Sequence, residues 1–541
     1  MRMMNEGRPT TPQPGAAETA VPSHLAPTFT GNKALMLEEP LIFECGSPHV
    51  TGVDLEPVPP HRSRLAGLER AAPIGLPGLS EGETVRHFTR LSRQNYGIDL
   101  GVFPLGSCTM KHNPRLNEKM ARLPGFADVH PLQPQDTVQG ALELIHKLAG
   151  WLKGLTNMPA VAMTPKAGAH GELCGMLAIR AAHEARGDAR KVVLVPESAH
   201  GTNPATAAFC GYAVEDIPAD ARGRVDTDAL IARLGPDVAA VMITNPNTCG
   251  LFEPDLKRIS DAVHAVGAYV YCDGANFNAI VGRVRPGDLG VDAMHINLHK
   301  TFSTPHGGGG PGSGPVVFSA ALAPFAPLPF VVEEPTAPGL RGDRGVRYHL
   351  VEEETASAED HGNSFGRLAA FHGQMGMFVR ALAYIMSHGA DGLRQVAEDA
   401  VLNANYILRS LEDVMSAPFA ATGPCMHEAL FDDSFLKDTG LTTLDVAKAL
   451  IDEGFHPMTM YFPLVVHGAM LIEPTETEGR WRLDQFIGSM RTLALAARSG
   501  ETARFATAPH FAPRSRLDET RAARKPILTW QPPADDRLAA E

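Results

Sequence analysis

The chain has 541 residues, of which 44% are hydrophobic and 20% charged, so it can bury a sizeable core and is not globally disordered. Its formal net charge of −13 argues against nucleic acid and anionic membranes as general partners. The cysteines are widely spaced, no apolar stretch is long enough to span a membrane, and the N-terminus lacks a signal-peptide core. These features predict a soluble, cytoplasmic protein without a zinc knuckle or other metal site.

The first part of the chain is predicted to be an arm followed by a segment with one helix and one loop. Residues 1–35 are rich in Pro, Thr and Ala, which predicts a mobile N-terminal arm. Within residues 36–125, the spacing of apolar residues from Gly82 onward predicts a helix. The stretch from Gly97 to Asn113 is dense in Gly, Pro, Ser and Asn, which predicts an interface or active-site loop.

Residues 126–330 alternate between helical and strand patterns, which predicts a large α/β domain. Short β-branched runs separated by helices are typical of a mostly parallel sheet covered by helices on both faces. The predicted helices are 141–155, 168–186, 226–234 and 256–266, and the predicted strands are 191–195, 239–244, 268–273, 295–298 and 316–318.

The last third of the chain is predicted to form a connection and a second domain. Residues 331–366 are rich in Pro, Glu and Arg, which favours a linker or an active-site flap. A helical pattern from Arg367 to Ala390 then leads into a smaller C-terminal α+β domain, residues 367–541.

An acid and a lysine follow two successive apolar runs of the α/β region. Asp273 ends the run from Tyr269, and Lys300 follows the run from Met294 to Leu298. Pyridoxal phosphate needs this pair, because a lysine amine forms a Schiff base with the cofactor and a carboxylate keeps the pyridine nitrogen protonated. The glycine-rich stretch after Lys300 is not a P-loop, because no Gly-Lys-Ser/Thr follows it.

A phosphate site is predicted upstream of this pair. Gly168, Ala169 and His170 open a helix, where backbone N–H groups and close approach suit a phosphate.

Further cofactor contacts are predicted at the edge of the sheet where the parallel strands end. His200 follows a strand and can stack on the pyridine ring, and Thr202 can reach a ring oxygen or the phosphate. Ala275, two residues after Asp273, is small enough to pack under the ring. The order of these residues matches the fold-type I pyridoxal enzymes.

Longer strings of sequence carry a more specific resemblance, which covers roughly residues 38 to 530. They are PLGSCTMKHNPR (104–115), AGAHGEL (167–173), SAHGTNPA (198–205), TNPNTCGLFE (244–253), DGANFNAI (273–280), NLHKTFSTPHGGGGPG (297–312), GFHPMTMYFPL (454–464) and IEPTETE (472–478). Together they resemble the glycine-cleavage P-proteins, which are pyridoxal-dependent glycine decarboxylases. The chain is similar to the C-terminal, lysine-bearing half of that enzyme made as a separate subunit.

The resemblance implies a reaction and two protein partners. Glycine would lose CO2, and its aminomethyl group would pass to the lipoyl arm of an H-protein. Lys300, Asp273 and His299 would be catalytic, with Lys300 or His299 moving protons. A companion subunit 1, with two copies of each subunit in the assembly, is implied as well.

Other functions remain open from the residues alone. The same cofactor layout serves amino-acid decarboxylases and cysteine desulfurases. A desulfurase needs a mobile nucleophilic cysteine, for which Cys108 is the candidate, although a buried structural thiol is the favoured interpretation. A non-catalytic regulatory subunit is disfavoured, because both Asp273 and Lys300 are present.

Overall fold

The computed structural model describes residues 39–47, 49–57, 59–60, 62–72, 74–307, 312–336, 345–353, 355–356, 363–512 and 515–530. The predicted arm, residues 1–35, lies outside the described residues, as do parts of the glycine-rich stretch after Lys300 and of the predicted flap. The described residues form two compact units, one within residues 39–97, 448–455 and 503–530 and the other within residues 98–447 and 456–502. The finer division at residues 125, 330 and 366 stays a prediction.

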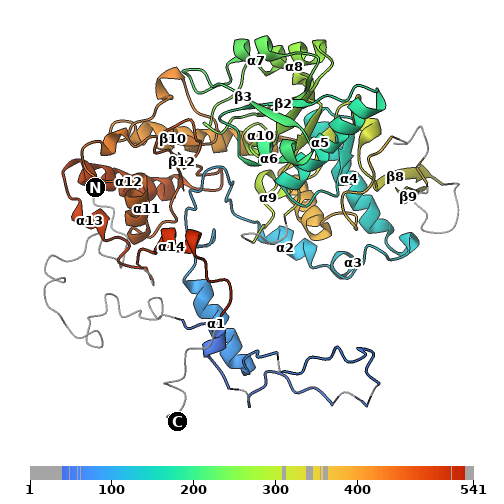
Figure 1. The fold of residues 1–541 in the computed structure, drawn as a ribbon, viewed down its shortest axis with the longest axis horizontal. Helices are drawn as coiled ribbons and strands as arrows, with labels where there is room; N and C mark the ends of the chain where they lie inside the picture. Colours follow the sequence, from blue (N-terminus) through green and yellow to red (C-terminus); the bar gives the residue numbers. More distant parts are fainter. Residues whose placement is uncertain are drawn as a thin grey trace. The chain divides into compact units, whose positions relative to one another are not determined.

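A seven-stranded sheet organises the larger unit (Figure 1). Its order is β1-β7-β6-β5-β4-β2-β3. The strands β3, β2, β4, β5 and β6 are parallel neighbours, whereas β7 runs antiparallel to both β6 and β1. The strands are β1 (Ala160–Ala162), β2 (Val192–Pro196), β3 (Ala213–Ile217), β4 (Val238–Thr244), β5 (Tyr269–Asp273), β6 (Ala293–His295) and β7 (Val316–Phe318).

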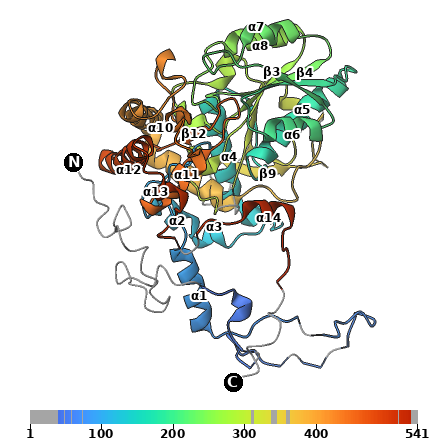
Figure 2. The same cartoon turned by 60° about the vertical axis from the view of Figure 1, so that its left-hand side comes forward.

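Helices cover both faces of this sheet, as predicted. Alternate residues of β2 enter different cores: Val192 and Leu194 pack on one side, and Val193 and Val195 on the other, because successive side chains of a strand point to opposite faces. The helices α5 and α6 lie together in both views (Figures 1 and 2). This part of the unit contains α2 (Arg115–Ala121), α3 (Pro124–Ala127), α4 (Gln139–Thr156), α5 (Gly168–Ala185), α6 (Thr202–Phe209), α7 (Thr227–Arg233), α8 (Leu256–Ala265) and α9 (Leu298–Thr301).

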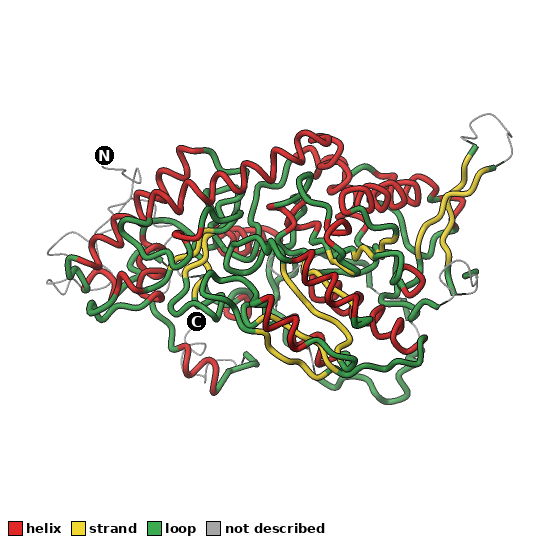
Figure 3. The backbone as a smooth tube through the Cα atoms, turned by 90° about the horizontal axis from the view of Figure 1, so that it is seen from above, coloured by secondary structure: helices red, strands yellow, loops and turns green. Residues whose placement is uncertain are grey.

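A hairpin and a smaller α+β part complete the larger unit. The hairpin strands β8 (Phe330–Pro335) and β9 (Val346–Val351) extend away from the other strands (Figure 3). The smaller part has an antiparallel sheet of order β10-β12-β11, which confirms the C-terminal α+β prediction. The long helix α10 (Met375–Leu411) packs against α2 and α4 beside the large sheet and also against α12 (Arg480–Arg498). The other elements of the smaller part are β10 (Ala429–Phe431), β11 (Thr459–Met460), β12 (Met470–Ile472) and α12.

The other compact unit contains a capped helix and a partly buried cluster of polar side chains. Ser80 caps α1 (Glu81–Arg93) through a reciprocal pair of hydrogen bonds with Glu83. The Glu39 carboxylate lies 2.8 Å from His87 Nδ1 and also binds Arg90. Two short helices, α13 (Ala503–Ala506) and α14 (Glu519–Arg524), belong to this unit, and α11 (Thr443–Asp452) spans the boundary in sequence.

Two predicted elements near the site are wrong in detail. The predicted strand 295–298 does not exist: β6 ends at His295, and Leu298 begins the short helix α9 that carries Lys300. The predicted helix from Arg367 begins only at Met375 and continues to Leu411, with a non-helical break at Gly389. No helix in the described part of the chain is long and apolar enough to cross a membrane.

Candidate active site

A polar cavity of about 170 Å³ lies where β4, β5 and β6 end. It brings together seven of the predicted site residues: Gly168, Ala169, His200, Thr202, Asp273, Ala275 and Lys300. It also contains residues that the sequence reasoning gave no role, namely Ser107, Glu172, Thr244, Thr248, Asn276, His295 and Asn297. His170 and His299 do not line it.

Asp273 is a buried carboxylate fixed on both oxygens. Oδ1 accepts a hydrogen bond from Ala275 N at 2.9 Å, and Oδ2 accepts one from Asn203 Nδ2 at 3.0 Å. The neighbouring strand places His295 Nε2 3.3 Å from Oδ1. Burial acts to raise the pKa of Asp273, but His295, these two hydrogen bonds and the charge of Lys300 outweigh it and lower the pKa. Asp273 therefore stays ionised in the cavity.

The Gly274 position allows this close contact between strands β5 and β6. A Cβ on Gly274 would lie 1.9 Å from the backbone oxygen of His295, so a larger residue would push the strands apart. His295 is held in turn by the hydroxyl of Tyr271, which lies 2.6 Å from its Nδ1. The backbone of His295 on β6 therefore leaves room only for glycine at position 274, in the turn after β5.

Lys300 is 8% exposed and reaches the cavity from α9. Its Nζ donates a hydrogen bond to Ser107 O at 2.8 Å. Ser107 lies on the predicted loop from Gly97 to Asn113 and adopts a positive φ of 64°, so the loop turns sharply where it meets the lysine. The predicted loop therefore contributes to the site by its backbone.

The predicted phosphate cradle is the first turn of α5, which begins at Gly168. A Cβ on Gly168 would lie 3.1 Å from Asn297 Oδ1 and from His295 Nε2, so glycine keeps this corner open. Glu172 accepts a hydrogen bond from Thr202 Oγ1 at 2.7 Å. Burial and the charge of Asp273 raise the pKa of Glu172, which reduces negative charge beside the cradle.

His200 lies beside Thr202 after β2, as predicted. Its Nδ1 is 2.8 Å from Thr202 Oγ1, and its ring packs edge-on against Phe462 with centroids 5.6 Å apart. Burial and the nearby Lys300 charge lower the pKa of His200, although Asp273 opposes them. The imidazole is therefore mostly neutral at pH 7.

The two predicted histidines outside the cavity have other contacts. His299 Nδ1 accepts a hydrogen bond from Ser313 N at 3.3 Å, and burial together with the charges of Lys300 and His306 lowers the pKa of His299 to about 3. His170 Nδ1 accepts from Lys166 N at 3.2 Å. The catalytic role of His299 and the cofactor contact of His170 stay predictions.

The cavity suits a polar ligand such as pyridoxal phosphate. Buried polar atoms at or beside it have no hydrogen-bond partner within the described part of the chain: Thr244 Oγ1, Asn297 Oδ1 and Asn203 Oδ1. Such orphaned groups are costly unless a ligand or water satisfies them. The ionised carboxylate suits the cofactor's ring nitrogen, the lysine suits its aldehyde, and the helix N-terminus suits its phosphate.

Two buried carboxyl groups hold the Ser107 loop from the side of the smaller sheet. Glu428 precedes β10 and accepts a hydrogen bond from Ser107 N, and Glu473 follows β12 and accepts one from Thr109 Oγ1 at 2.5 Å. The pairing of Ala429 with Ile472 places these glutamates side by side. Burial raises the pKa of Glu428 to about 7 and, together with the charge of Glu428, raises that of Glu473 well above its usual range.

The raised pKa of Glu428 predicts a loss of stability with rising pH. An unfolded glutamate ionises near pH 4.5 and the folded one near pH 7, so between these values the folded state binds more protons. The contribution of Glu428 to the free energy of unfolding should therefore fall by about 1 kcal/mol per pH unit in this window. Glu428→Gln should remove this contribution and make the slope less steep in denaturant titrations from pH 5 to 7, while the contribution of Glu473 remains. The exposed Glu184→Gln serves as the control, and an unchanged slope in Glu428→Gln would contradict the assignment.

Cys108 does not have the features of a desulfurase nucleophile. Its thiol is largely buried, its Sγ lies 3.7 Å from Met110 Sδ, and burial raises its pKa. A reactive cysteine needs a lowered pKa and access, so the structure favours the structural interpretation of Cys108.

Comparisons with known proteins agree on one family. The family described as "Glycine dehydrogenase, C-terminal domain" matches residues 396–509, and "Aminotransferase class-V" matches residues 172–309. The chain is 68% identical over 541 residues to the probable glycine dehydrogenase (decarboxylating) subunit 2 of Caulobacter vibrioides, with 100% of each chain covered. It is 48% identical to the protein of the same name from Desulforamulus reducens, covering 92% of this chain and 100% of the relative.

Solved structures show the same fold at lower identity. A glycine decarboxylase (P-protein) of the glycine cleavage system, in inhibitor-bound form, aligns with a TM-score of 0.65 at 21% identity, covering 79% of this chain and 94% of that one. Glutamate decarboxylase from Lactobacillus brevis aligns with a TM-score of 0.59 at 15% identity, covering 80% and 96%. These matches confirm the predicted fold-type I architecture.

Proposed function

The chain belongs to the glycine dehydrogenase (decarboxylating) subunit 2 family, the subunit 2 form of the glycine cleavage P-protein, and we propose that its cavity around Lys300 binds pyridoxal phosphate and decarboxylates glycine. The observation that carries this proposal is the meeting of Asp273, Lys300 and the N-terminus of α5 around one cavity. Each of the three matches a different part of the cofactor. No feature of the described residues favours the regulatory or desulfurase alternatives.

Each residue has a distinct part in the proposed binding. Lys300 bonds covalently to the cofactor, Asp273 pairs with its ring nitrogen, and the first turn of α5 receives its phosphate. His200 would stack on the ring, Ala275 would pack under it, and Thr202 would reach a ring oxygen or the phosphate. When bound, the cofactor would supply an electron sink for the electron pair that stays on the substrate carbon when CO2 leaves.

The protein's own groups control the protons of the reaction. Asp273 holds the proton on the ring nitrogen, because its own low pKa favours the ionised carboxylate as acceptor. The Lys300 amine, once free, lies within reach of the cavity and can take or return a proton. His299 is a second candidate, adjacent to Lys300 in the chain.

We further propose a subunit 1 as partner, because the relatives are called subunit 2, in an assembly of two copies of each subunit. A lipoylated H-protein accepts the aminomethyl group in this proposal, since the sequence has no Cys-x-x-Cys pair that would serve as a redox dithiol. All seven cysteines are free thiols. Free thiols also suit a reducing compartment, so we propose the cytoplasm as its location.

Exchange of labelled bicarbonate into the carboxyl group of glycine tests this function. The chain together with subunit 1 and lipoylated H-protein should catalyse exchange, and the chain alone should show little. The matched control is H-protein without its lipoyl group, which should give background exchange. Full activity of the isolated chain towards glycine, with no response to H-protein, would instead support a simple amino-acid decarboxylase.

A further inference from the structure

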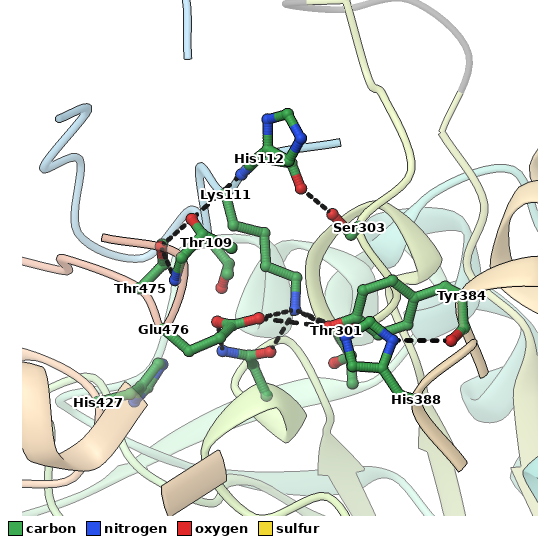
Figure 4. A network of polar contacts seen from close by, with 12 residues as sticks. Thr109, Lys111, His112, Thr301, Ser303, Tyr384, His388, His427, Thr475 and Glu476 are labelled. Atoms are coloured by element: carbon green, nitrogen blue, oxygen red, sulfur yellow. Dashed lines mark hydrogen bonds and ion pairs between the residues drawn. The ribbon is translucent and has the colours of Figure 1, made fainter. Parts of the chain in front are cut away.

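Lys111 is a lysine buried as deeply as the core, with 2% of its surface exposed. Its Nζ makes an ion pair and several hydrogen bonds at once (Figure 4). The partners are Glu476 Oε1 at 2.7 Å, Asn278 Oδ1 at 2.8 Å, Thr301 O at 2.9 Å and Tyr384 OH at 3.2 Å. The side chain does not line the cavity around Lys300.

These partners come from segments that are far apart in the sequence. Asn278 lies in the short helix η5 (Phe277–Ala279) after β5, and Thr301 is the last residue of α9. Tyr384 lies on α10, and Glu476 follows β12 in the smaller α+β part. Lys111 thus connects the segments beside the Lys300 cavity with the segment that follows the smaller sheet.

The contact with Thr301 is made to the backbone next to Lys300. The last carbonyl groups of a helix lack partners inside the helix, and α9 has a single turn. Lys111 supplies a charged donor to the carbonyl oxygen of Thr301. This bond fixes the end of the turn from which the Lys300 side chain leaves.

The loop that carries Lys111 also holds Lys300 at other places. Ser107 O accepts the hydrogen bond from Lys300 Nζ at 2.8 Å. The hydroxyl of Ser303 donates to His112 O, a contact visible in Figure 4. One loop therefore contacts the amine of Lys300 and the backbone on its C-terminal side.

The charge of Lys111 is balanced locally. Burial acts to lower the pKa of Lys111, but Glu476 and Tyr384 outweigh it and raise the pKa, so the ammonium stays charged. Glu476 is fixed as well, since its Oε2 accepts from Asn278 Nδ2 at 3.2 Å and its Oε1 from Tyr384 OH at 3.3 Å. A closed network of this kind has little freedom to rearrange.

We propose that Lys111, paired with Glu476, is a positioning residue that holds the α9 turn so that the Lys300 amine meets the cofactor and the substrate in the correct geometry. The inference rests on the proposed function of Lys300. A small displacement of a reacting group can lower a rate by about 100-fold, so the network should affect the reaction without touching substrate.

The test separates positioning from stability by a double substitution. Lys111→Met leaves the buried Glu476 carboxylate without its cation, and Glu476→Gln leaves the buried Lys111 ammonium without its anion, so each should lower the melting temperature. The double variant removes both charges and should recover most of the melting temperature. If Lys111 positions Lys300, kcat in the assembled enzyme should stay at least about tenfold below wild type in the double variant, with KM for glycine little changed.

A third variant covers the possibility that the single variants do not fold. Lys111→Arg keeps the charge but replaces a compact ammonium by a planar fork. It should fold, keep the cofactor bound, and show a lowered kcat with a shifted pH profile of the Lys300–cofactor absorbance. The exposed Lys257→Met, which removes the surface pair with Asp261, should behave as wild type.

Recovery of both melting temperature and kcat in the double variant, or a wild-type kcat and absorbance profile in Lys111→Arg, would overturn the proposal and leave Lys111 as a structural residue. Failure of the proposed function gives a different result, because wild-type protein with subunit 1 and H-protein would then show neither cofactor absorbance nor bicarbonate exchange.

Discussion

Asp273→Asn is expected to reduce glycine decarboxylation by roughly three orders of magnitude. The neutral amide cannot stabilise a proton on the ring nitrogen, so the electron sink is weakened. A loss of about 4 kcal/mol of charge stabilisation corresponds to about 10³ in rate. Cofactor affinity should fall less, because Lys300 and the first turn of α5 remain. Steady-state kinetics of the assembled enzyme and titration with pyridoxal phosphate measure the two effects.

The control for this substitution is Asp261→Asn, because Asp261 is exposed on α8 and pairs only with the surface Lys257 in the described structure. Its turnover should equal that of wild type. Turnover of Asp273→Asn within a few-fold of wild type would contradict the role given to the carboxylate, since that role depends on its charge.

Lys300→Ala is expected to abolish covalent attachment of the cofactor. The decarboxylation rate should fall by about 10²–10⁴-fold, which is the usual contribution of a positioned proton-transfer group. The fold should survive, because the only hydrogen bond from Lys300 Nζ in the described structure goes to Ser107 O. Absorbance of the bound cofactor and the rate of bicarbonate exchange check both parts. A variant that retains wild-type exchange would show that another lysine carries the reaction.

The predicted layout of the cavity depended on residues that follow strands. Asp273 and His200 are predicted at one sheet edge because each follows an apolar run, and the first turn of α5 is predicted as a phosphate site because it opens a helix upstream of them. The structure brings the three together. The predicted strand before Lys300 is wrong, because the short apolar run from Met294 to Leu298 is compatible with either a strand or a buried helix. The structure divides that run between β6 and α9.

Other parts of the site depend on contacts that local pattern does not reveal. His295 could have been identified once the two strands were paired. Cys272 pairs with Met294 in the parallel strands β5 and β6, so the next residues, Asp273 and His295, lie side by side. Glu428, Glu473 and Glu476 could not, because they reach the loop around Ser107 from the C-terminal part of the chain. Their burial is decided by tertiary packing and not by the spacing of apolar residues nearby.

Borohydride reduction followed by peptide mapping tests directly whether Lys300 carries the cofactor. Reduction fixes the bond between the lysine amine and pyridoxal phosphate, so the labelled peptide identifies the residue. We expect one pyridoxyl group per chain, on the peptide that contains Lys300, and none in Lys300→Ala. A label on Lys111, on Lys166 or on any other lysine would contradict it.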